Sequence, residues 1–292
     1  MKIYLDYIKT SLFWYLFFIG INLSQLHSEV IPPKGSFLVT TVLTKQSGMF
    51  ALFNSVLGSL NLYQSGNYSG LKIDLNDGFY LDPSRGPNWW EYYFEPINLG
   101  NKAAPHYVFS INEILSITSV GAQLDRKNAF ALIQKYVHIK PHIQKEIDSY
   151  VAKNFKHHYL IGVHHRGTDK FLEVPIVPYE KTLKTLLEVI NNLPRSKRNK
   201  LVIYIATDEM QFITYLQKNL PYKIIYNDFA RSDNGYALHA SNRYTNNYEK
   251  GREALLDCIL LSKCNLLIRP NSTLSIISSK FNPNLPEIVL SY

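Results

Sequence analysis

The sequence predicts an α/β protein built from two doubly wound, Rossmann-like domains. The chain has 292 residues and is 46% hydrophobic, which is enough for one large core or two smaller ones. β-branched runs of strand length alternate with longer stretches of helical period, a pattern typical of parallel sheets. Three strands of the second half end in polar side chains, at the edge where parallel sheets bind ligands.

Residues 1–28 predict a signal peptide or a signal anchor. Lys2 and Lys9 precede an unbroken apolar run over residues 11–23, which is short for a membrane span. A basic stretch before a short apolar stretch is typical of secretory signals, with cleavage near Ser28. A buried first helix is a third reading. We therefore expect the secretory route or membrane attachment through residues 11–23: the Golgi or ER lumen in a eukaryote, the periplasm or envelope in a bacterium.

Residues 29–150 predict an N-terminal α/β domain. A strand over residues 36–43, a helix over 49–62 and a strand over 70–75 form the opening of a parallel sheet. Residues 80–97 differ, because Pro and Gly interrupt a segment crowded with Trp, Tyr and Phe. Such a segment either packs into the core or offers a platform to a sugar ring, and we favour packing.

We expect a second domain over residues 151–292. The boundary between the two domains is expected near a helical pattern that ends at about residue 155. Strands and helices again alternate, as in a doubly wound parallel unit. Two expected helices, over residues 125–137 and 141–155, lead into this domain. Within it we expect helices over residues 179–192, 210–219 and 249–262, and a last helix that begins near Thr273. The expected strands are the apolar run that ends before His164 and residues 201–208, 223–227 and 265–272.

The net charge of +8 permits a nucleic acid, an anionic membrane or a phosphorylated ligand as partner. The densest basic run, residues 195–200, lies between a helical pattern and a strand and predicts a solvated loop. A nucleic-acid surface needs basic clusters interleaved with aromatic side chains, so no nucleic-acid partner is expected. Cys258 and Cys264 would face different directions on one helix, so no disulfide is expected between them.

Polar residues end three predicted strands, and together they suit a nucleotide. Arg166 can fork onto phosphate oxygens, and a helix that begins at Ser272 or Thr273 can donate backbone N–H groups to the same anion. Asp208 can accept hydrogen bonds from a base edge with adjacent N–H donors, which among common bases means guanine. Each residue alone is also explained as an ordinary helix cap, Asp208 above all.

The paired histidines face opposite sides of their strand, because side chains alternate along it. His164 shares its face with Arg166 and Thr168 and is placed in the site, whereas His165 is expected to be structural. No metal is expected, because the sequence contains no C-x-x-C, no H-E-x-x-H and no Asp-x-Asp. The absence of G-x-G-x-x-G and of a Walker loop disfavours dinucleotide and NTPase functions.

Three blocks carry a family resemblance: "IGVHHRGTDK", "IYIATDE" and "LHASNRYTNNYEKGREALLDCILLSKCNLLIRPNSTLS". In this order they resemble the core α1,6-fucosyltransferase family and its relative, the nodulation fucosyltransferase, over residues 136–279. The resemblance implies a GT-B-like fold, GDP-fucose as the donor, inversion at the anomeric carbon and no metal or other cofactor. It also implies a glycan acceptor, bound on the side of residues 29–150.

For nucleotide binding, the resemblance implies that His164 and Asp208 contact guanine and that Arg166 contacts the diphosphate. It assigns Asp169 to the ordering of the loop. Ser272 or Thr273 would contact phosphate.

For catalysis, the resemblance implies that Glu173, which stands one residue short of the family's glutamate, is the general base. Arg166, supported by Lys170, would stabilise the charge that grows on departing GDP. Gly167 stands where the family has a second arginine. We therefore expect an inverting, metal-independent glycosyltransferase that moves fucose to a glycan hydroxyl; the alternative is a catalytically inactive relative that binds a nucleotide or a carbohydrate.

Overall fold

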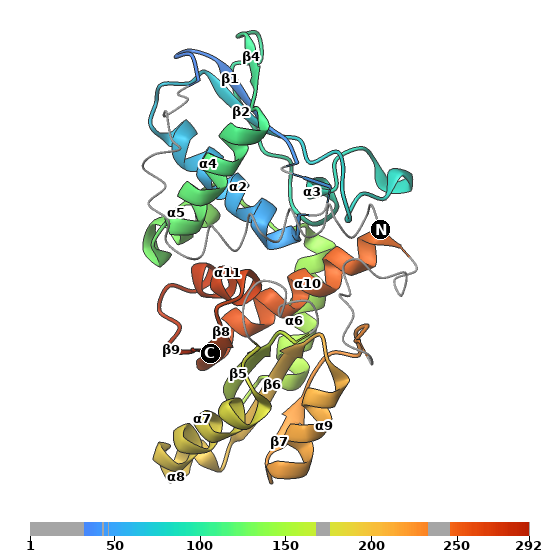
Figure 1. The fold of residues 1–292 in the computed structure, drawn as a ribbon, viewed down its shortest axis with the longest axis vertical. Coiled ribbons are helices and arrows are strands. Elements are labelled where there is room, and N and C mark those ends of the chain that lie inside the picture. The colour runs from blue at the N-terminus through green and yellow to red at the C-terminus, as the bar shows by residue number, and fades with distance from the viewer. Residues whose placement is uncertain (1–31, 43, 46, 168–175, 233–245, 292) are drawn as a thin grey trace.

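A computed structural model describes residues 32–42, 44–45, 47–167, 176–232 and 246–291 of the chain. Two β-sheets lie at opposite ends of the long axis, and three helices lie between them: α6 (Pro141–Asn154), α10 (Asn247–Ser262) and α11 (Thr273–Phe281) (Figure 1). Among the described residues no helix is both long and apolar enough to cross a membrane. The predicted leader over residues 1–28 lies outside the described residues.

The first sheet has the strand order β3-β2-β1-β4. Strand β1 (Phe37–Thr40) lies between β2 (Gly70–Ile73) and β4 (His106–Val108) and runs parallel to both. Strand β3 (Asn98–Gly100) is antiparallel to β2. The predicted strand–helix–strand unit is confirmed, while β3 and β4 are short additions for which no element was predicted.

Two glycines allow the helices of the first half to pack closely. Helix α2 (Met49–Gln64) packs along α4 (Ile111–Gln123). A Cβ atom on Gly58 or Gly121 would lie 2.0 Å or 1.9 Å from a carbonyl oxygen of the opposite helix, so a larger residue would push the helices apart. Ser110, the N-cap residue of α4, forms a capping box with Glu113 in the first turn, in which each side chain bonds the backbone N–H of the other residue.

The aromatic segment over residues 80–97 packs into the core, as predicted. It forms the short helices η2 (Pro83–Arg85) and α3 (Trp90–Tyr93). Its Trp89, Trp90, Tyr93 and Phe94 side chains are all at most 1% exposed. These rings are therefore not available as a platform for a sugar.

The second sheet is entirely parallel, with the order β7-β6-β5-β8-β9. Its strands are β5 (Tyr159–His165), β6 (Leu201–Thr207), β7 (Lys223–Ile225), β8 (Leu266–Pro270) and β9 (Glu287–Leu290). Its helices are α7 (Tyr179–Asn192), α8 (Arg195–Arg198), α9 (Met210–Asn219), α10 (Asn247–Ser262) and α11 (Thr273–Phe281). Helices α7 and α9 have the predicted bounds. The basic run was predicted to be a solvated loop, and this is corrected: it contains the one-turn helix α8, with Pro194 at its N-cap.

Helices cover both faces of the second sheet. Ile161 and Val163 of β5 pack with apolar residues of α7 and α9, whereas Leu160 belongs to the cluster that contains α10. This alternation along a strand is what a sheet buried on both faces requires. Cys258 and Cys264 are buried free thiols on the α10 side.

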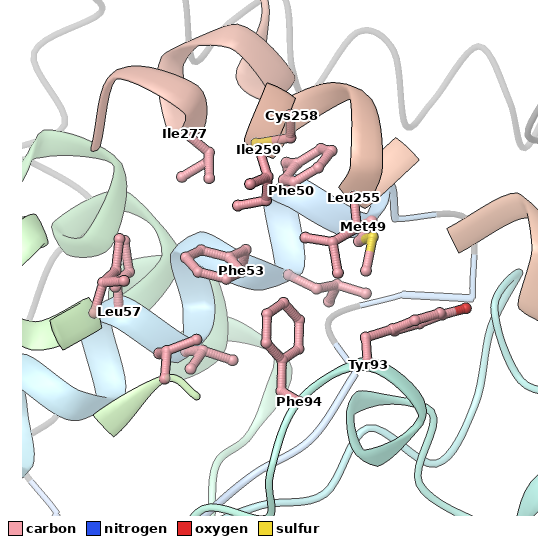
Figure 2. Close-up of a cluster of buried hydrophobic side chains, with 14 of the residues drawn as sticks. Met49, Phe50, Phe53, Leu57, Tyr93, Phe94, Leu255, Cys258, Ile259 and Ile277 are labelled. Carbon is pink, nitrogen blue, oxygen red and sulfur yellow. The ribbon is translucent and has the colours of Figure 1, made fainter. Parts of the chain in front are cut away.

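The two halves of the chain share one continuous hydrophobic core. Figure 2 shows Phe50 and Phe53 of α2 beside Leu255 and Ile259 of α10, and Ile277 of α11 belongs to the same cluster. Helix α6 (Pro141–Asn154) runs unbroken through the expected domain boundary at 150/151, and the second sheet begins after it.

Two basic side chains link the two halves of the chain, each donating hydrogen bonds to backbone carbonyl oxygens of the other half. Lys280 of α11 is buried and donates hydrogen bonds to the carbonyl oxygens of Gly121 (2.7 Å) and Ala122 (3.1 Å), at the end of α4. Arg126 of α5 (Arg126–Tyr136) donates in the opposite direction, to the carbonyl oxygens of Ser279, Asn282 and Leu285. Helix α11 is therefore fixed to the first half of the chain at its C-terminal end.

Candidate nucleotide site

The order of the second sheet reverses between β5 and β8, which creates a topological switch point. From β5 the chain proceeds outward to β6 and β7 on one side, then returns to β8 and β9 on the other. The connections diverge at such a point and leave a crevice beyond the carboxyl ends of the two central strands. Arg166 follows β5 there, and Ser272 follows β8. The residues singled out from the sequence thus lie at the position where open α/β sheets bind ligands.

Arg166 and Asp208 form an ion pair at the ends of β5 and β6. Their Nη1 and Oδ2 atoms are 3.1 Å apart, and the Asp208 side chain is only 6% exposed against 26% for Arg166. Asp208 also accepts a hydrogen bond from the backbone N–H of Gly167, at 3.0 Å. The carboxylate therefore holds the backbone directly after β5, and its charge orients the guanidinium.

Asp208 is not the N-cap residue of α9. That residue is Glu209, whose side chain makes no capping hydrogen bond. The carbonyl oxygen of Asp208 accepts a hydrogen bond from the backbone N–H of Ser232 at 2.7 Å, which ties the segment after β7 to the same place. Asp208 therefore links the ends of β5 and β6 to the segment that follows β7.

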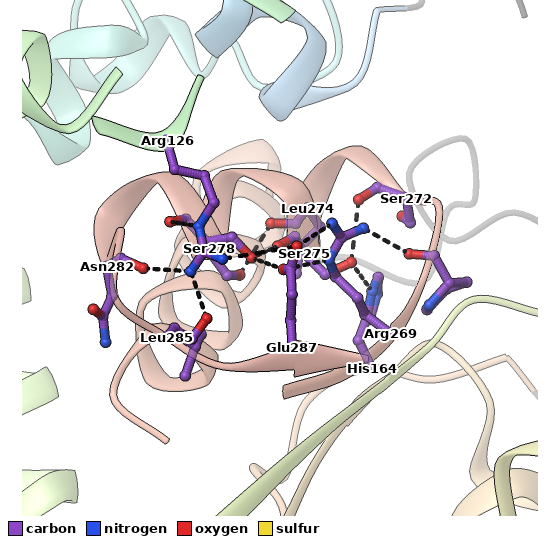
Figure 3. A network of polar contacts seen from close by, with 12 residues as sticks. Arg126, His164, Arg269, Ser272, Leu274, Ser275, Ser278, Asn282, Leu285 and Glu287 are labelled. Carbon is purple, nitrogen blue, oxygen red and sulfur yellow. Dashed lines mark hydrogen bonds and ion pairs between the residues drawn. The ribbon is translucent and has the colours of Figure 1, made fainter. Parts of the chain in front are cut away.

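His164 is buried and joins β5 to α11 across the switch point. Its Nδ1 atom lies 2.8 Å from the Oγ of Ser275, and that hydroxyl donates to the carbonyl oxygen of Ser272 at 3.1 Å (Figure 3). With the hydroxyl proton so used, Nδ1–H donates to Ser275 and Nε2 is the acceptor of the ring. Burial lowers the pKa of His164 to about 3, so the ring is neutral at neutral pH.

Helix α11 begins at Thr273, as predicted, and this start lies at the switch point. Ser272 is its N-cap, with extended φ and ψ of −128° and 136°, and Thr273 is its first residue. The first backbone N–H groups of a helix have no partner within it, and the helix dipole adds positive potential at this end. Ser272 makes no side-chain cap bond to these groups. This end of α11 can therefore receive an anion.

A polar network fixes α11 in place. Arg269 of β8 donates through Nε and Nη2 to the two carboxylate oxygens of Glu287 in β9, at 2.9 Å and 3.0 Å. Ser279 of α11 also donates a hydrogen bond to Glu287. The Nη1 atom of Arg126 lies 3.8 Å from Oε1 of the same carboxylate, and Figure 3 shows Arg126 on the same side of Glu287 as the end of α11. The hydrogen bonds to Glu287 lower its pKa against the opposing effect of burial. The network links the first half of the chain to the helix that carries Ser272.

His165 faces away from His164, as the alternation predicted, and has structural contacts. Its ring stacks on Phe212 at 4.2 Å between centroids, and its Nε2 lies 3.2 Å from Glu209. Tyr179 of α7 donates to the same oxygen of Glu209 at 2.8 Å. Burial, followed by the contact with Glu209, raises the pKa of Tyr179.

The structure thus brings together Arg166, Asp208, His164 and the start of α11 at Ser272 and Thr273. Lys170, Asp169 and Glu173 lie outside the described residues, as does Thr168. Among the described residues, no three His, Cys, Asp or Glu side chains are grouped so that they could hold a metal ion.

The contacts of Ser275, Glu209 and Tyr179 were not predicted. Ser275 lies one turn into a helix whose start was recognised, so the bond to His164 followed only once the order of β5 and β8 was known. Glu209 is directly after Asp208 in the sequence, but its partners come from β5 and α7.

The chain and its fold are similar to known proteins. The family model described as Nodulation protein Z (NodZ) matches residues 123–291. The fold is similar to NodZ α1,6-fucosyltransferase co-crystallised with GDP, with 17% identity over 88% of this chain and 96% of that chain and a TM-score of 0.58. It is also similar to a variant of Arabidopsis thaliana FUT1 in complex with GDP (11% identity, 92% and 72% coverage, TM-score 0.53). A third similar structure is POFUT1 in complex with GDP, with 10% identity over 90% of this chain and 100% of that chain and a TM-score of 0.51.

These three similarities are similarities of fold, and they extend over both sheets. The expected GT-B-like architecture is therefore confirmed.

Proposed function

This chain belongs to the nodulation protein Z (NodZ) family and is a glycosyltransferase, and we propose that it transfers fucose from GDP-fucose to a hydroxyl group of a glycan. One observation carries the proposal. An arginine held by a buried carboxylate and the N-terminus of a helix meet at the switch point of a parallel sheet, where a diphosphate can receive a guanidinium fork and backbone N–H groups together.

The donor nucleotide is proposed to bind across β5 and β8. Arg166 contacts the diphosphate, and Ser272 or Thr273 contacts it from the start of α11. His164, neutral and held by Ser275, offers its Nε2 as an acceptor to the base. Asp208 holds Arg166 and has oxygen lone pairs that can also accept from the guanine edge. Asp169, next to this site in the sequence, is proposed to order the loop.

The proposed reaction is a direct displacement with inversion. Glu173 takes the proton of the acceptor hydroxyl while that oxygen forms a bond to the anomeric carbon. The bond from this carbon to the departing phosphate oxygen breaks at the same time, and its electron pair leaves with GDP. Arg166 and Lys170 stabilise the negative charge that develops on the diphosphate, where preorganised donors have their largest effect.

We propose that the reaction needs no metal ion. The sequence contains no Asp-x-Asp, the arrangement with which many sugar-nucleotide enzymes hold a cation. Arg166, Lys170 and the start of α11 supply positive charge at the diphosphate in its place. We expect fucose transfer to proceed at the same rate with and without excess EDTA. A loss of transfer in EDTA that Mg²⁺ or Mn²⁺ restores would reject the proposal that no metal ion is needed.

We also propose that residues 1–28 direct the chain to a secretory compartment or to a membrane, through the apolar run over residues 11–23. Fractionation of cells that express the full chain, together with N-terminal sequencing of the purified protein, tests this. A full-length chain recovered from the soluble cytoplasmic fraction would reject the proposal.

A screen of GDP-sugars tests the function. GDP release is measured from GDP-fucose and GDP-mannose with a set of glycan acceptors, with and without the acceptor present. We expect acceptor-dependent release from GDP-fucose. GDP binding without release from either sugar, over the whole set, would identify a catalytically inactive relative instead.

A further inference from the structure

Gly167, the residue after Arg166, has no room for a side chain. A Cβ atom built on it would lie 1.8 Å from Oε2 and 2.1 Å from Cδ of Glu209. The backbone does not explain the glycine, because the φ of Gly167 lies outside the left-handed region. The Glu209 carboxylate therefore occupies the space that any other residue at this position would need.

Two hydrogen bonds hold the Glu209 carboxylate in that space. Tyr179 of α7 donates to Oε2 at 2.8 Å, and the Nε2 of His165 lies 3.2 Å from the same oxygen. The Glu209 side chain is 15% exposed, and the His165 ring is itself packed on Phe212. The carboxylate can swing away from a new Cβ only by breaking contacts with β5 and α7 together.

The backbone at Arg166 and Gly167 is thus held by two adjacent residues after β6. Asp208 binds Arg166 and the N–H of Gly167, and Glu209 closes the side on which a Cβ would lie. If a Cβ forced this backbone to move, the bond from Gly167 to Asp208 and the placement of the guanidinium would change with it.

We propose that Glu209 is a positioning residue for the donor diphosphate: braced by His165 and Tyr179, it fixes the backbone at Arg166 and Gly167 and disfavours any residue larger than glycine at position 167. The inference rests on the proposed function in one respect only, that Arg166 contacts the diphosphate. It assigns to Glu209 no contact with the substrate.

A cycle of substitutions in the full chain tests the proposal, with GDP affinity measured by calorimetry. Gly167→Ala is expected to weaken GDP binding about tenfold in the wild-type background, which corresponds to about 1.4 kcal/mol. In the Glu209→Ala background the added methyl group has room, so Gly167→Ala should change GDP affinity by less than about twofold. Glu209→Gln keeps the bulk, and there Gly167→Ala should again cost about tenfold.

Gly48→Ala is the matched control. Gly48 has an ordinary φ of −68°, and a Cβ on it would meet nothing within 4 Å, so GDP affinity should not change. An equal loss from Gly167→Ala in all three Glu209 backgrounds would overturn the inference. Should Gly167→Ala fail to fold, Tyr179→Phe removes one brace without adding bulk; it should weaken GDP binding severalfold, and unchanged affinity would overturn the inference.

The free energy of unfolding, measured over the same cycle, separates this inference from the proposed function. The wild-type protein could fail to bind GDP while substitutions at positions 167 and 209 still have non-additive effects on the free energy of unfolding. That result would reject the nucleotide site but would support the contact between Glu209 and residue 167. Wild-type protein that binds GDP, while the two positions act additively, would reject the role of Glu209 alone.

Discussion

Arg166 and Asp208 pair across the ends of two adjacent parallel strands, with 3.1 Å between Nη1 and Oδ2. The pair is asymmetric, because the carboxylate is buried and the guanidinium is partly exposed. A buried charge needs a partner, and here the partner is a guanidinium, which has several N–H donors in a planar fork. The ion pair therefore presents an oriented arginine at the switch point of the sheet.

Arg166→Lys is predicted to weaken GDP binding about tenfold or more. Lysine keeps the charge but loses the planar fork, and a charged hydrogen bond contributes about 1.5–3 kcal/mol. Calorimetric titration with GDP measures the effect, with Arg195→Lys on the exposed helix α8 as the control. Unchanged affinity in Arg166→Ala would show that Arg166 does not bind phosphate.

Asp208→Asn is predicted to weaken GDP binding and to reduce the preference for GDP over ADP. The amide loses the charge that holds Arg166, and it presents an N–H group where a guanine donor needs an acceptor. A mispaired buried polar group costs about 1–3 kcal/mol. Titrations with both nucleotides distinguish the roles: an equal loss for GDP and ADP would limit Asp208 to holding Arg166 and the backbone after β5.

His164 predicts a pH dependence of stability. Burial lowers its pKa from 6.5 to about 3 in the folded protein, so below pH 6.5 the unfolded chain takes up a proton that the folded protein does not. Stability therefore falls as the pH falls from 6.5 toward 3. Between pH 7 and pH 5 this loss amounts to about 2 kcal/mol.

His164→Asn removes the titrating ring and keeps a donor for Ser275. Urea unfolding at pH 7 and pH 5 should show a smaller loss of stability in this variant than in the wild type. Identical losses in the two proteins would mean that His164 is not held neutral by the fold.

Glu173→Gln is predicted to slow fucosyl transfer about 10²–10⁴-fold, the usual contribution of a general base. GDP affinity should stay within about twofold, because the proposed base acts on the acceptor. Glu180→Gln is the matched control, since Glu180 lies in the first turn of α7 and has a structural role at the helix dipole. If only the Glu180 variant lost transfer, Glu180 would be the general base and Glu173 would not. If both variants kept full transfer, the general base would be another residue.

Lys280→Met is predicted to lower the free energy of unfolding by about 2–3 kcal/mol. The substitution leaves the carbonyl oxygens of Gly121 and Ala122 without this buried donor. Lys263→Met, at the exposed C-cap of α10, is the control for the loss of a lysine. Equal stability of the two variants in chemical denaturation would show that the link between α11 and α4 contributes nothing.

The second half of the fold was the more predictable part. Helices α7 and α9 have strong apolar periodicity between clear strand patterns, and their bounds were predicted to the residue. Helix α4 was not predicted, although its capping box is visible in the sequence at Ser110 and Glu113, because Ser, Thr and Gly dilute its apolar stripe. Strands β3, β4 and β9 are each three or four residues long, so a period of two is hardly expressed.

The site was predictable as far as strand ends reveal it. Arg166, Asp208 and Ser272 each follow an apolar run, so their meeting at one edge follows from parallel strands alone. The contact between Glu209 and Gly167 could not be predicted, because it depends on the rotamer of one side chain and on braces from β5 and α7. The same holds for Ser275, whose bond to His164 requires β5 and β8 to be neighbours.

Transfer of the sugar itself tests the central claim most directly. The wild-type chain and Arg166→Lys are incubated with GDP-fucose labelled in the sugar, together with a mixture of glycan acceptors, and label in the glycans is followed over time. We predict labelled glycan from the wild type and at least about tenfold slower labelling by the variant at the same subsaturating donor concentration. GDP binding by a folded wild-type protein, with no label transferred to any acceptor, would contradict the claim.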